Sequence, residues 1–332
     1  MKIRSYYLLA AALSGSLASL PATAHAAVIT GVTVTDSATA FSPDYSADKA
    51  VDGDTSDYAS QNQGADTFLQ FAFPGARQVN RVVVMNRDSP AEADWIGNFT
   101  LTFDGGLSTS IARTAIRGGS AIISLGGTYT ATGVRLDVDT TGSAGPGGNT
   151  GAQEVFFLSP MTDKVAVSGV TVAGSATPFS ADYAAAGALD GIVGRSQGAG
   201  VTPEYASAGL GVDAYVDFNL GAILPVGGFD LFDRPAGADR VSAFDLIFSV
   251  NSVFGDGDDT TLSFNGTGMA TSGEFASIQA QYVRYDVTAK SGAGVNTGLS
   301  EIVFYAAIPE PSSAAVSLAA LAGLGLRRRR RR

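Results

Sequence analysis

The sequence predicts an all-β protein of two tandem β-sandwiches, with one apolar segment at each end of the chain. A block of 23 residues at 31–53 recurs at 169–191, and 15 of its positions are identical. Short runs of β-branched and aromatic residues follow each block, separated by Gly, Asp and Ser turns. This pattern is typical of a sandwich or jelly roll. We find no amphipathic helix pattern outside the two termini.

The amino end, residues 1–26, has the features of a secretory signal peptide. Lys2 and Arg4 precede an apolar stretch at 6–20, and Ala-His-Ala at 24–26 forms a small-x-small cleavage site. Such a segment serves export and is left out of the fold. We place cleavage by signal peptidase after residue 26, with Ala27 as the alternative.

The first copy, residues 27–159, is predicted to form one sandwich. Residues 68–73 alternate between apolar and polar side chains, as expected for a half-buried strand. Val82 and Val84 have the same spacing and are predicted to be core residues. The expected strands lie at 68–73, 79–87, 98–103, 121–125, 132–138 and 153–158.

Residues 160–164 are the predicted linker, and the second copy occupies 165–307. The motif Asn-Thr-Gly-x-x-Glu at 149–154 returns at 296–301, so the repeat extends to the last strand. The period is about 140 residues, which is too long for a solenoid repeat or a propeller blade. It is the size of a domain that buries its own core.

The carboxyl end, residues 308–332, combines Pro309-Glu310-Pro311 with an apolar run of 15 residues and six terminal arginines. Arginines beside an apolar helix stay in the cytoplasm, so the body lies outside. We expect the run to form a transmembrane helix of about 22 Å, which is short against a hydrocarbon core of about 30 Å.

This order of features resembles the PEP-CTERM sorting signal of Gram-negative, exopolysaccharide-producing bacteria. The resemblance implies an exosortase that cuts near the Pro-Glu-Pro after transient anchoring in the inner membrane. The body would then reach the cell surface or the extracellular matrix. An ordinary C-terminal anchor with a stop-transfer cluster is the alternative.

The exported body is strongly acidic and lacks several kinds of reactive side chain. Eight of the 21 basic residues lie in the terminal segments, which leaves 13 against 31 acidic residues, a net charge near −18. This charge repels nucleic acid and anionic lipid. The chain has no cysteine, and its one histidine, His25, lies in the signal peptide. Thiolate and imidazole metal sites, cysteine nucleophiles and Ser-His-Asp triads are therefore excluded. Any metal must be held by oxygen, which points to calcium.

The first copy resembles a known family. Residues 45–54, Tyr-Ser-Ala-Asp-Lys-Ala-Val-Asp-Gly-Asp, look like the opening loop of discoidin-type domains. That family includes coagulation-factor type C domains and many bacterial carbohydrate-binding modules. Residues 80–87 and 98–101 are similar to its middle strands, and Glu154-Val155 to its terminal Glu-aliphatic pair. The resemblance implies an eight-stranded jelly roll with galactose-binding-like topology.

Asp52, Asp54 and Glu154 form the predicted calcium site. Calcium takes about six to eight oxygen ligands, and a tight Asp-Gly-Asp turn presents two carboxylates and several carbonyls. The resemblance places the opening loop beside the last strand, so that Glu154 closes the site. It also adds a backbone carbonyl from residues 49–50 and an oxygen of Asp57. The alternative is that Asp-Gly-Asp is only a polar turn.

The second copy keeps part of this set. Asp190 and Glu301 remain, but Ile192 stands where the first copy has Asp54. Residues 193–195 bring a positive charge and lengthen the loop. We therefore expect a structural calcium ion in the first copy more than in the second.

Trp95 is the main candidate for ligand contact. Carbohydrate sites stack an aromatic ring on the sugar and add Arg, Asn or Asp as hydrogen-bond partners. Trp95 is the only tryptophan and lies in a loop at 88–95 between two strands. The alternative is that its ring folds back as a lid on the core. Arg87, matched by Arg234 in the second copy, is the other candidate contact, with a strand-end salt bridge as its alternative.

The sequence predicts an exported, exosortase-sorted surface or matrix protein whose modules bind an exopolysaccharide or another glycan without catalysis. One alternative is a purely structural matrix protein with no sugar site. The other is a carboxylate-dependent glycosidase, for which residues 256–259, Asp-Gly-Asp-Asp, are the densest acidic cluster. That cluster also fits a long hairpin turn. Because two binding-type folds account for nearly the whole body, we predict that the protein is not an enzyme.

Overall fold

The computed structural model describes residues 28–143, 148–194 and 204–308. The predicted signal peptide and the sorting residues Pro309, Glu310 and Pro311 lie outside the described residues. Within the described ranges, no helix has both the length and the apolar character needed to cross a bilayer.

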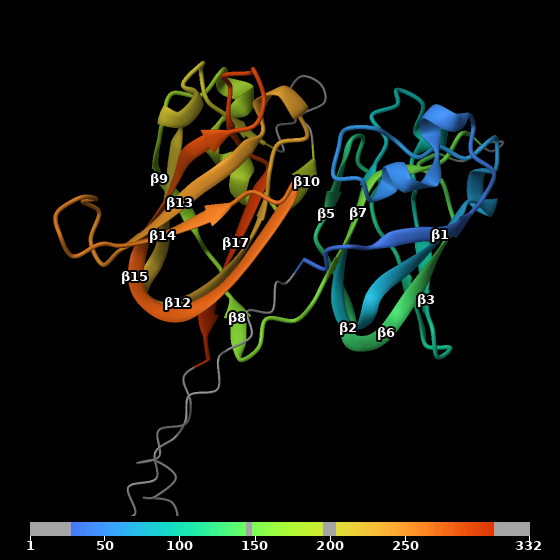
Figure 1. The fold of residues 1–332 in the computed structure, drawn as a ribbon, viewed down its shortest axis with the longest axis horizontal. Helices are drawn as coiled ribbons and strands as arrows, with labels where there is room; N and C mark the ends of the chain where they lie inside the picture. Colours follow the sequence, from blue (N-terminus) through green and yellow to red (C-terminus); the bar gives the residue numbers. More distant parts are fainter. Residues whose placement is uncertain (1–27, 144–147, 195–203, 309–332) are drawn as a thin grey trace, which may run out of the picture.

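The described chain forms two β-sandwiches side by side (Figure 1). The first copy contains β1 Thr33–Ser37, β2 Phe68–Asn86, β3 Phe99–Phe103, β4 Ser108–Ile111, β5 Gly119–Ala121, β6 Ile123–Val138 and β7 Ala152–Leu158. The second contains β8 Lys164–Ala166, β9 Thr171–Ser175, β10 Ile192–Gly194, β11 Tyr205–Ala206, β12 Tyr215–Phe232, β13 Val241–Ser249, β14 Thr260–Asn265, β15 Ala270–Lys290, β16 Gly298–Leu299 and β17 Glu301–Ala307. The predicted all-β architecture of two tandem jelly-roll sandwiches is confirmed.

Short 3-10 turns are the only helical elements among the described residues. They are η1 Pro43–Tyr45, η2 Ala47–Ala50, η3 Gly64–Asp66, η4 Glu92–Asp94, η5 Ala181–Tyr183, η6 Ala185–Leu189, η7 Gly211–Asp213 and η8 Gly237–Asp239. In Figure 1 the turns of both copies lie at the same end of the molecule, opposite β8. The loops that carry the candidate site residues of both copies therefore share one end of the molecule.

Two long, bent strands join the layers of each sandwich. In the first copy the strand order is β1-β2-β6-β3-β4, with β7 beside β2, and in the second it is β14-β13-β15-β12-β17-β8, with β9 beside β12. The sequence predicted separate strands at 68–73 and 79–87, but both belong to β2. Its pairing with β6 shifts register between Ala72 and Arg77, where Gly75 has φ +125°. Such an irregularity bends a strand without ending it, so β2 passes from one layer to the other.

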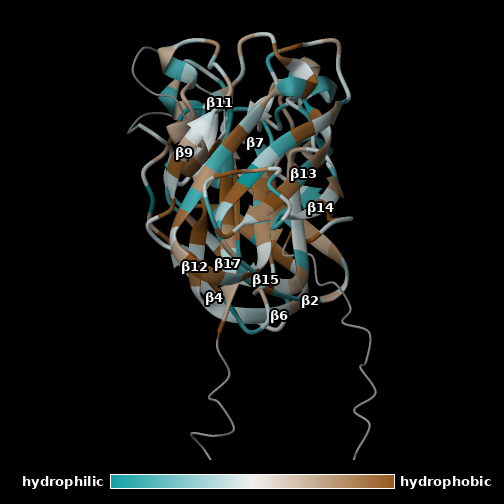
Figure 2. Cartoon of the chain, turned by 90° about the vertical axis from the view of Figure 1, so that its left-hand side faces the viewer, coloured by the Kyte–Doolittle hydropathy of each residue, from teal (hydrophilic) through white to brown (hydrophobic). Residues whose placement is uncertain are grey.

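Each copy has its own aromatic core. Val82 and Val84 are fully buried, as predicted. Phe71 packs edge to face on Phe157, with ring centroids 5.1 Å apart. The second copy repeats this arrangement with Phe218 and Phe304, at 5.4 Å. Figure 2 shows the hydrophobic residues, in brown, gathered along strands such as β12 and β17.

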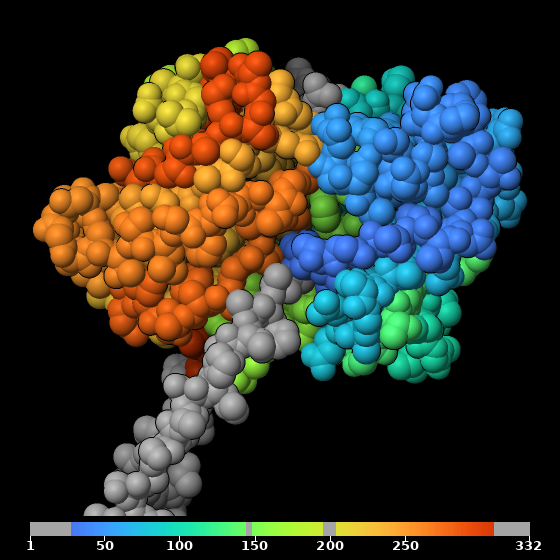
Figure 3. Space-filling view, viewed as in Figure 1, coloured from blue at the N-terminus to red at the C-terminus, as the bar shows by residue number. Residues whose placement is uncertain are grey.

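The two copies also share an interface, which the sequence did not predict. Strand β5 of the first copy pairs antiparallel with β10 of the second. Beside it lies a buried apolar cluster that includes Val83 and Met85 from the first copy and Phe232 and Met269 from the second. We call this contact surface the seam, and Figure 3 shows the two lobes meeting along it.

A buried ion pair crosses the seam. The Arg81 guanidinium lies 2.7 Å from Asp230, a side chain with no exposed surface. Asp230 also accepts hydrogen bonds from the hydroxyls of Tyr305, at 2.6 Å, and Ser272, at 2.5 Å. Because each oxygen of this carboxylate has a donor, the ion pair avoids the cost of an unsatisfied buried charge. The seam is therefore a specific contact with both apolar and charged parts.

Candidate functional site

The Asp-Gly-Asp loop of the first copy meets the last strand as the sequence predicted. The loop follows η2, and Gly53 has φ +70°, a conformation that glycine adopts without strain. Its backbone N–H donates to Glu154 Oε1 on β7 at 2.5 Å. Asp52 Oδ1 accepts the N–H of Asp54 at 2.9 Å, and Asp52 Oδ2 accepts the Ser56 hydroxyl at 2.8 Å. The fold thus brings Asp52 and Glu154 together.

The pair of Asp52 and Glu154 places a buried carboxyl group beside a second carboxylate. Glu154 is 1% exposed, and burial raises its pKa to about 9, with the nearby Asp52 adding to the rise. The Lys49 ammonium lies 3.2 Å from Asp52 Oδ2, on the exposed side of the loop. A buried carboxyl group beside a second carboxylate either holds a proton or faces a cation. The all-oxygen donor set of this pair fits a hard cation such as calcium.

The other two predicted ligands point elsewhere. Asp54 Oδ1 lies 3.4 Å from the guanidinium of Arg240, which belongs to the second copy. Asp57 Oδ2 lies 3.3 Å from Arg87 Nε. The four predicted carboxylates are therefore divided between the Gly53 turn and two arginines.

The second copy repeats the contact between loop and last strand. Glu301 on β17 accepts the N–H of Gly191 at 2.9 Å, and burial raises its pKa to about 9, with Asp190 adding to the rise. Asp190 Oδ1 accepts the N–H of Ile192 at 2.8 Å. Ile192 then begins β10, which pairs with β5 of the first copy. Asp190 of this loop and Glu301 of β17 therefore offer two carboxyl groups. Ile192, which follows the loop, belongs to the seam.

Trp95 lines a surface hollow of about 390 Å³. Its ring is partly exposed, and its Nε1–H donates to the Ser89 carbonyl oxygen at 2.9 Å, which fixes the ring. The hollow is lined by Glu92, Trp95, Gly97, Asn98, Arg113, Thr114, Ala115, Thr140, Thr141 and Gly142. We call it the Trp95 groove. Sequence reasoning found the tryptophan but missed the polar residues, because they come from three separate segments of the chain.

Arg113 supports this groove from inside. Its guanidinium donates to the carbonyl oxygens of Val84, at 2.6 Å, and Ile96, at 2.8 Å, and to Asn86 Oδ1 at 2.8 Å. Burial lowers its pKa to about 10. These partners are neutral oxygens, so they hold the guanidinium in the groove wall without neutralising its charge.

Arg87, the other predicted ligand contact, is buried in ion pairs. The guanidinium is 3.3 Å from Asp57 and 3.4 Å from Asp94, and it lies over the Tyr45 ring at 5.2 Å from the centroid. Arg234 of the second copy has the same kind of environment, with Tyr183 beneath it. This geometry matches the strand-end salt bridge that was the alternative for Arg87.

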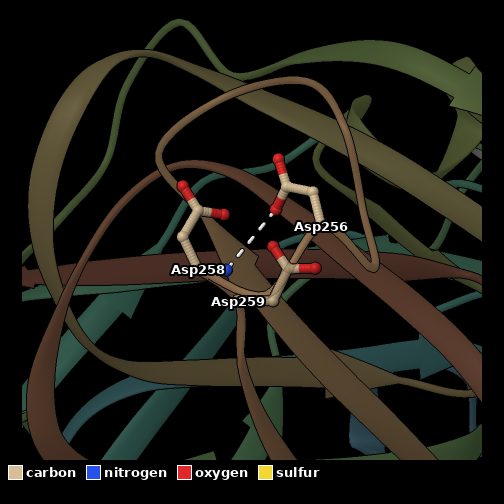
Figure 4. Close-up of side chains that lie close together, drawn as sticks. All are labelled: Asp256, Asp258 and Asp259. Atoms are coloured by element: carbon tan, nitrogen blue, oxygen red, sulfur yellow. Dashed lines mark hydrogen bonds between the residues drawn. The ribbon is translucent and has the colours of Figure 1, made fainter.

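The densest acidic cluster sits on a hairpin tip. Figure 4 shows Asp256, Asp258 and Asp259 together in the loop between β13 and β14. Asn251 Nδ2 donates to Asp256 at 3.0 Å and to Asp258 at 3.2 Å. Asp256 and Asp258 are exposed. The arrangement is the long hairpin turn that the sequence offered as an alternative to a catalytic cluster.

A family model matches the chain twice, at residues 23–156 and 164–305, and is described as a domain of unknown function, DUF7402. The chain belongs to this family. Each DUF7402 match takes in one sandwich, including its Asp-Gly loop and the glutamate of its last strand. No curated protein matches the chain.

Solved structures similar to this tandem of DUF7402 domains include a serum fucolectin of the striped bass Morone saxatilis. It has 13% identity, a TM-score of 0.34, and coverage of 84% of this chain and 96% of that chain. The CBM32-1 and CBM32-2 domains of Clostridium perfringens ZmpB have 10% identity, a TM-score of 0.33, and coverage of 82% and 92%. A chitosan-binding module of a Paenibacillus chitosanase/glucanase has 24% identity, a TM-score of 0.32, and coverage of 43% and 95%.

Proposed function

We propose that the protein binds a glycan without catalysis, and that the ligand lies in the Trp95 groove of the first copy. The observation that carries this proposal is a fixed, partly exposed tryptophan in a hollow with Asn98, Glu92 and Thr114. An aromatic face beside hydrogen-bonding side chains is the combination that sugars require. The rigid ring would lose little freedom on binding, which favours affinity.

The chemistry of the groove favours binding over hydrolysis. Glu92 is the only carboxylic acid among the residues that line it. Glycosidases in general use two carboxyl groups on either side of the scissile bond. The hairpin aspartates 256, 258 and 259 lie in another part of the chain and line no part of this groove.

Calcium is the cofactor that we propose, in a structural role. Asp52 and Glu154 would hold it in the first copy, with backbone carbonyls of residues 49–50 nearby. Asp190 and Glu301 would hold it less well in the second. When bound, the ion would neutralise the negative charge of the buried glutamate side chains. The raised pKa of Glu154 and the all-oxygen donor set support this proposal.

We also propose that the protein is exported and then sorted to the cell surface. The signal-peptide pattern at 1–26 and the Pro309-Glu310-Pro311 tail support handling by signal peptidase and an exosortase. The protein would then act at the cell surface or in the extracellular matrix of a Gram-negative bacterium. There the producer's own exopolysaccharide is the ligand that we propose first.

A polysaccharide binding screen of residues 27–307 tests this function. The screen is run in calcium and repeated in chelator, with Trp95→Ala beside the wild-type chain. We expect at least one glycan to be retained, and we expect Trp95→Ala to weaken its binding by about tenfold or more, since about 1.4 kcal/mol is a factor of ten. Chelator should also weaken binding.

Leu107→Ala is the matched control, because Leu107 is 64% exposed and lies in the turn before β4, outside the groove. It should bind as the wild type does. If no polysaccharide is retained, or if Trp95→Ala binds normally, the groove is not a glycan site. A purely structural matrix role would then be the better account.

A further inference from the structure

Arg240 occupies in the second copy the position that Trp95 occupies in the first. Each residue directly follows a 3-10 turn, Trp95 after η4 and Arg240 after η8. Both are preceded by Ala-Asp. The repeat therefore places an arginine where the first copy has its groove tryptophan.

The contacts beside these two residues confirm that the positions correspond. The N–H of Ile96, next to Trp95, donates to Asn86 Oδ1 at the end of β2, at 2.9 Å. The N–H of Val241, next to Arg240, donates to Asp233 Oδ2 just after β12, at 2.8 Å. The same backbone anchor thus holds both loops.

Unlike Trp95, Arg240 reaches across the seam. Its guanidinium donates to the Gly53 carbonyl oxygen and lies 3.4 Å from Asp54 Oδ1. The Arg240 side chain is 15% exposed, whereas that of Asp54 is 63% exposed. The second copy therefore places a fixed positive charge on the Asp-Gly-Asp loop of the first.

The rest of this loop also faces the second copy. A cavity of about 200 Å³ lies between the copies, with Asp52, Gly53 and Glu154 on one side. Thr267, Met269 and Ala270 of the second copy line the other side. In Figure 3 blue atoms of the first lobe meet orange atoms of the second along the seam. Residues of both copies therefore surround the proposed cation site.

Arg240 and a divalent cation would act on the same loop. The guanidinium contacts the Gly53 carbonyl oxygen and Asp54, which directly follow the proposed calcium ligand Asp52. Arg240 and a bound calcium ion would therefore place two cations on one short loop. The positive charge of Arg240 opposes a second cation nearby, and the low exposure of its side chain limits screening by solvent.

We propose that Arg240 is a resident cation that competes with calcium for the loop at 52–54, so that metal binding and docking of the second copy are coupled. The inference rests on the proposed calcium site. Coupling of this kind is reciprocal. Calcium would loosen the Arg240 contact, and loss of that contact would favour calcium.

Calorimetric calcium titration and thermal unfolding of the full chain test the proposal, with Arg240→Ala, Asp52→Ala and the wild type compared. We expect Arg240→Ala to bind calcium several-fold more tightly than the wild type. In chelator its melting temperature should be lower than that of the wild type, and calcium should restore it. Asp52→Ala should abolish binding at this loop. Arg135→Ala, which removes a partly exposed cation on β6 that pairs with Asp137, should leave the calcium affinity unchanged.

The outcomes separate the coupling from the calcium site itself. If Asp52→Ala abolishes binding but Arg240→Ala binds as the wild type does, the coupling is wrong and the site stands. If only Arg240→Ala binds calcium, the competition is supported, and calcium is not a cofactor of the natural chain. If no variant binds calcium at this loop, both ideas fail.

Discussion

At the scale of single residues, Glu154 and Glu301 occupy equivalent buried positions in the two copies. Each lies on the last strand of its copy, and each accepts the N–H of the glycine in an Asp-Gly loop. The resemblance to discoidin-type domains allowed the contact of Glu154 with its loop to be predicted, and the repeat, which preserves the glutamate and the Asp-Gly pair, extended that prediction to Glu301. The sequence did not reveal that Asp54 and Asp57 pair with arginines, because those partners are distant in sequence.

The raised pKa of Glu154 predicts how stability depends on pH without metal. An unfolded glutamate has its pKa near 4.5, and burial raises the folded value to about 9. Between these values the folded protein holds a proton that the unfolded chain has released. Glu154 should therefore lower the free energy of unfolding as pH rises through this window, by up to about 1.4 kcal/mol per pH unit. Glu154→Gln should reduce this slope, so in chelator it should be more stable than the wild type at pH 8.

Urea unfolding in chelator at several pH values measures this slope. Glu92→Gln is the control, since Glu92 is exposed and should leave the slope unchanged. Added calcium should flatten the slope of the wild type, because a bound cation favours the ionised carboxylate. An unchanged slope in Glu154→Gln would show that its carboxyl group ionises normally in the folded protein.

At the scale of elements, the repeated motif Asn-Thr-Gly-x-x-Glu has a steric reason. A Cβ added at Gly151 would overlap the carbonyl oxygen of Tyr58, and one at Gly298 would overlap that of Tyr205. The chain before the last strand therefore passes directly against the loop that carries Tyr58 or Tyr205. The strands were predicted from alternation, from β-branched and aromatic runs and from turn residues. The continuous β2 was not predicted, because Pro74-Gly75 resembles a turn.

Gly151→Ala and Gly298→Ala should therefore each destabilise the protein. Overpacking of this kind typically costs about 1–3 kcal/mol, and here the obstacle is backbone that cannot move aside without breaking strand pairing. Denaturant unfolding measures the loss. Gly127→Ala is the control, because the nearest atom to an added Cβ there is 3.8 Å away. A loss no larger than that of Gly127→Ala would mean that the loop adjusts freely.

At the scale of the whole molecule, a strand pair, a buried apolar cluster and an ion pair join the two copies at the seam. The sequence indicated two domains that each bury a core, and both cores are present. It gave no sign of the contact between them, since Arg81, Asp230 and Tyr305 each look like ordinary strand residues. Their roles depend on how the two sandwiches face each other. The contact of Arg240 with the loop at 52–54 also depends on how the sandwiches face each other, because that loop belongs to the other copy.

If the seam couples the copies, the wild type should unfold in a single calorimetric transition, and Asp230→Ala should separate it into two. Removing one partner of a buried ion pair costs about 3–5 kcal/mol, because the other charge is left uncompensated. Arg81 would be that charge, at the contact between the copies. The hydroxyls of Tyr305 and Ser272 in the second copy would also lose their acceptor. Asp217→Ala is the matched control. It breaks the 2.6 Å pair with Arg284 inside the second copy, so it should lower the melting temperature while keeping one transition. A single transition in Asp230→Ala would mean that the apolar cluster and the β5–β10 pairing suffice to couple the two copies.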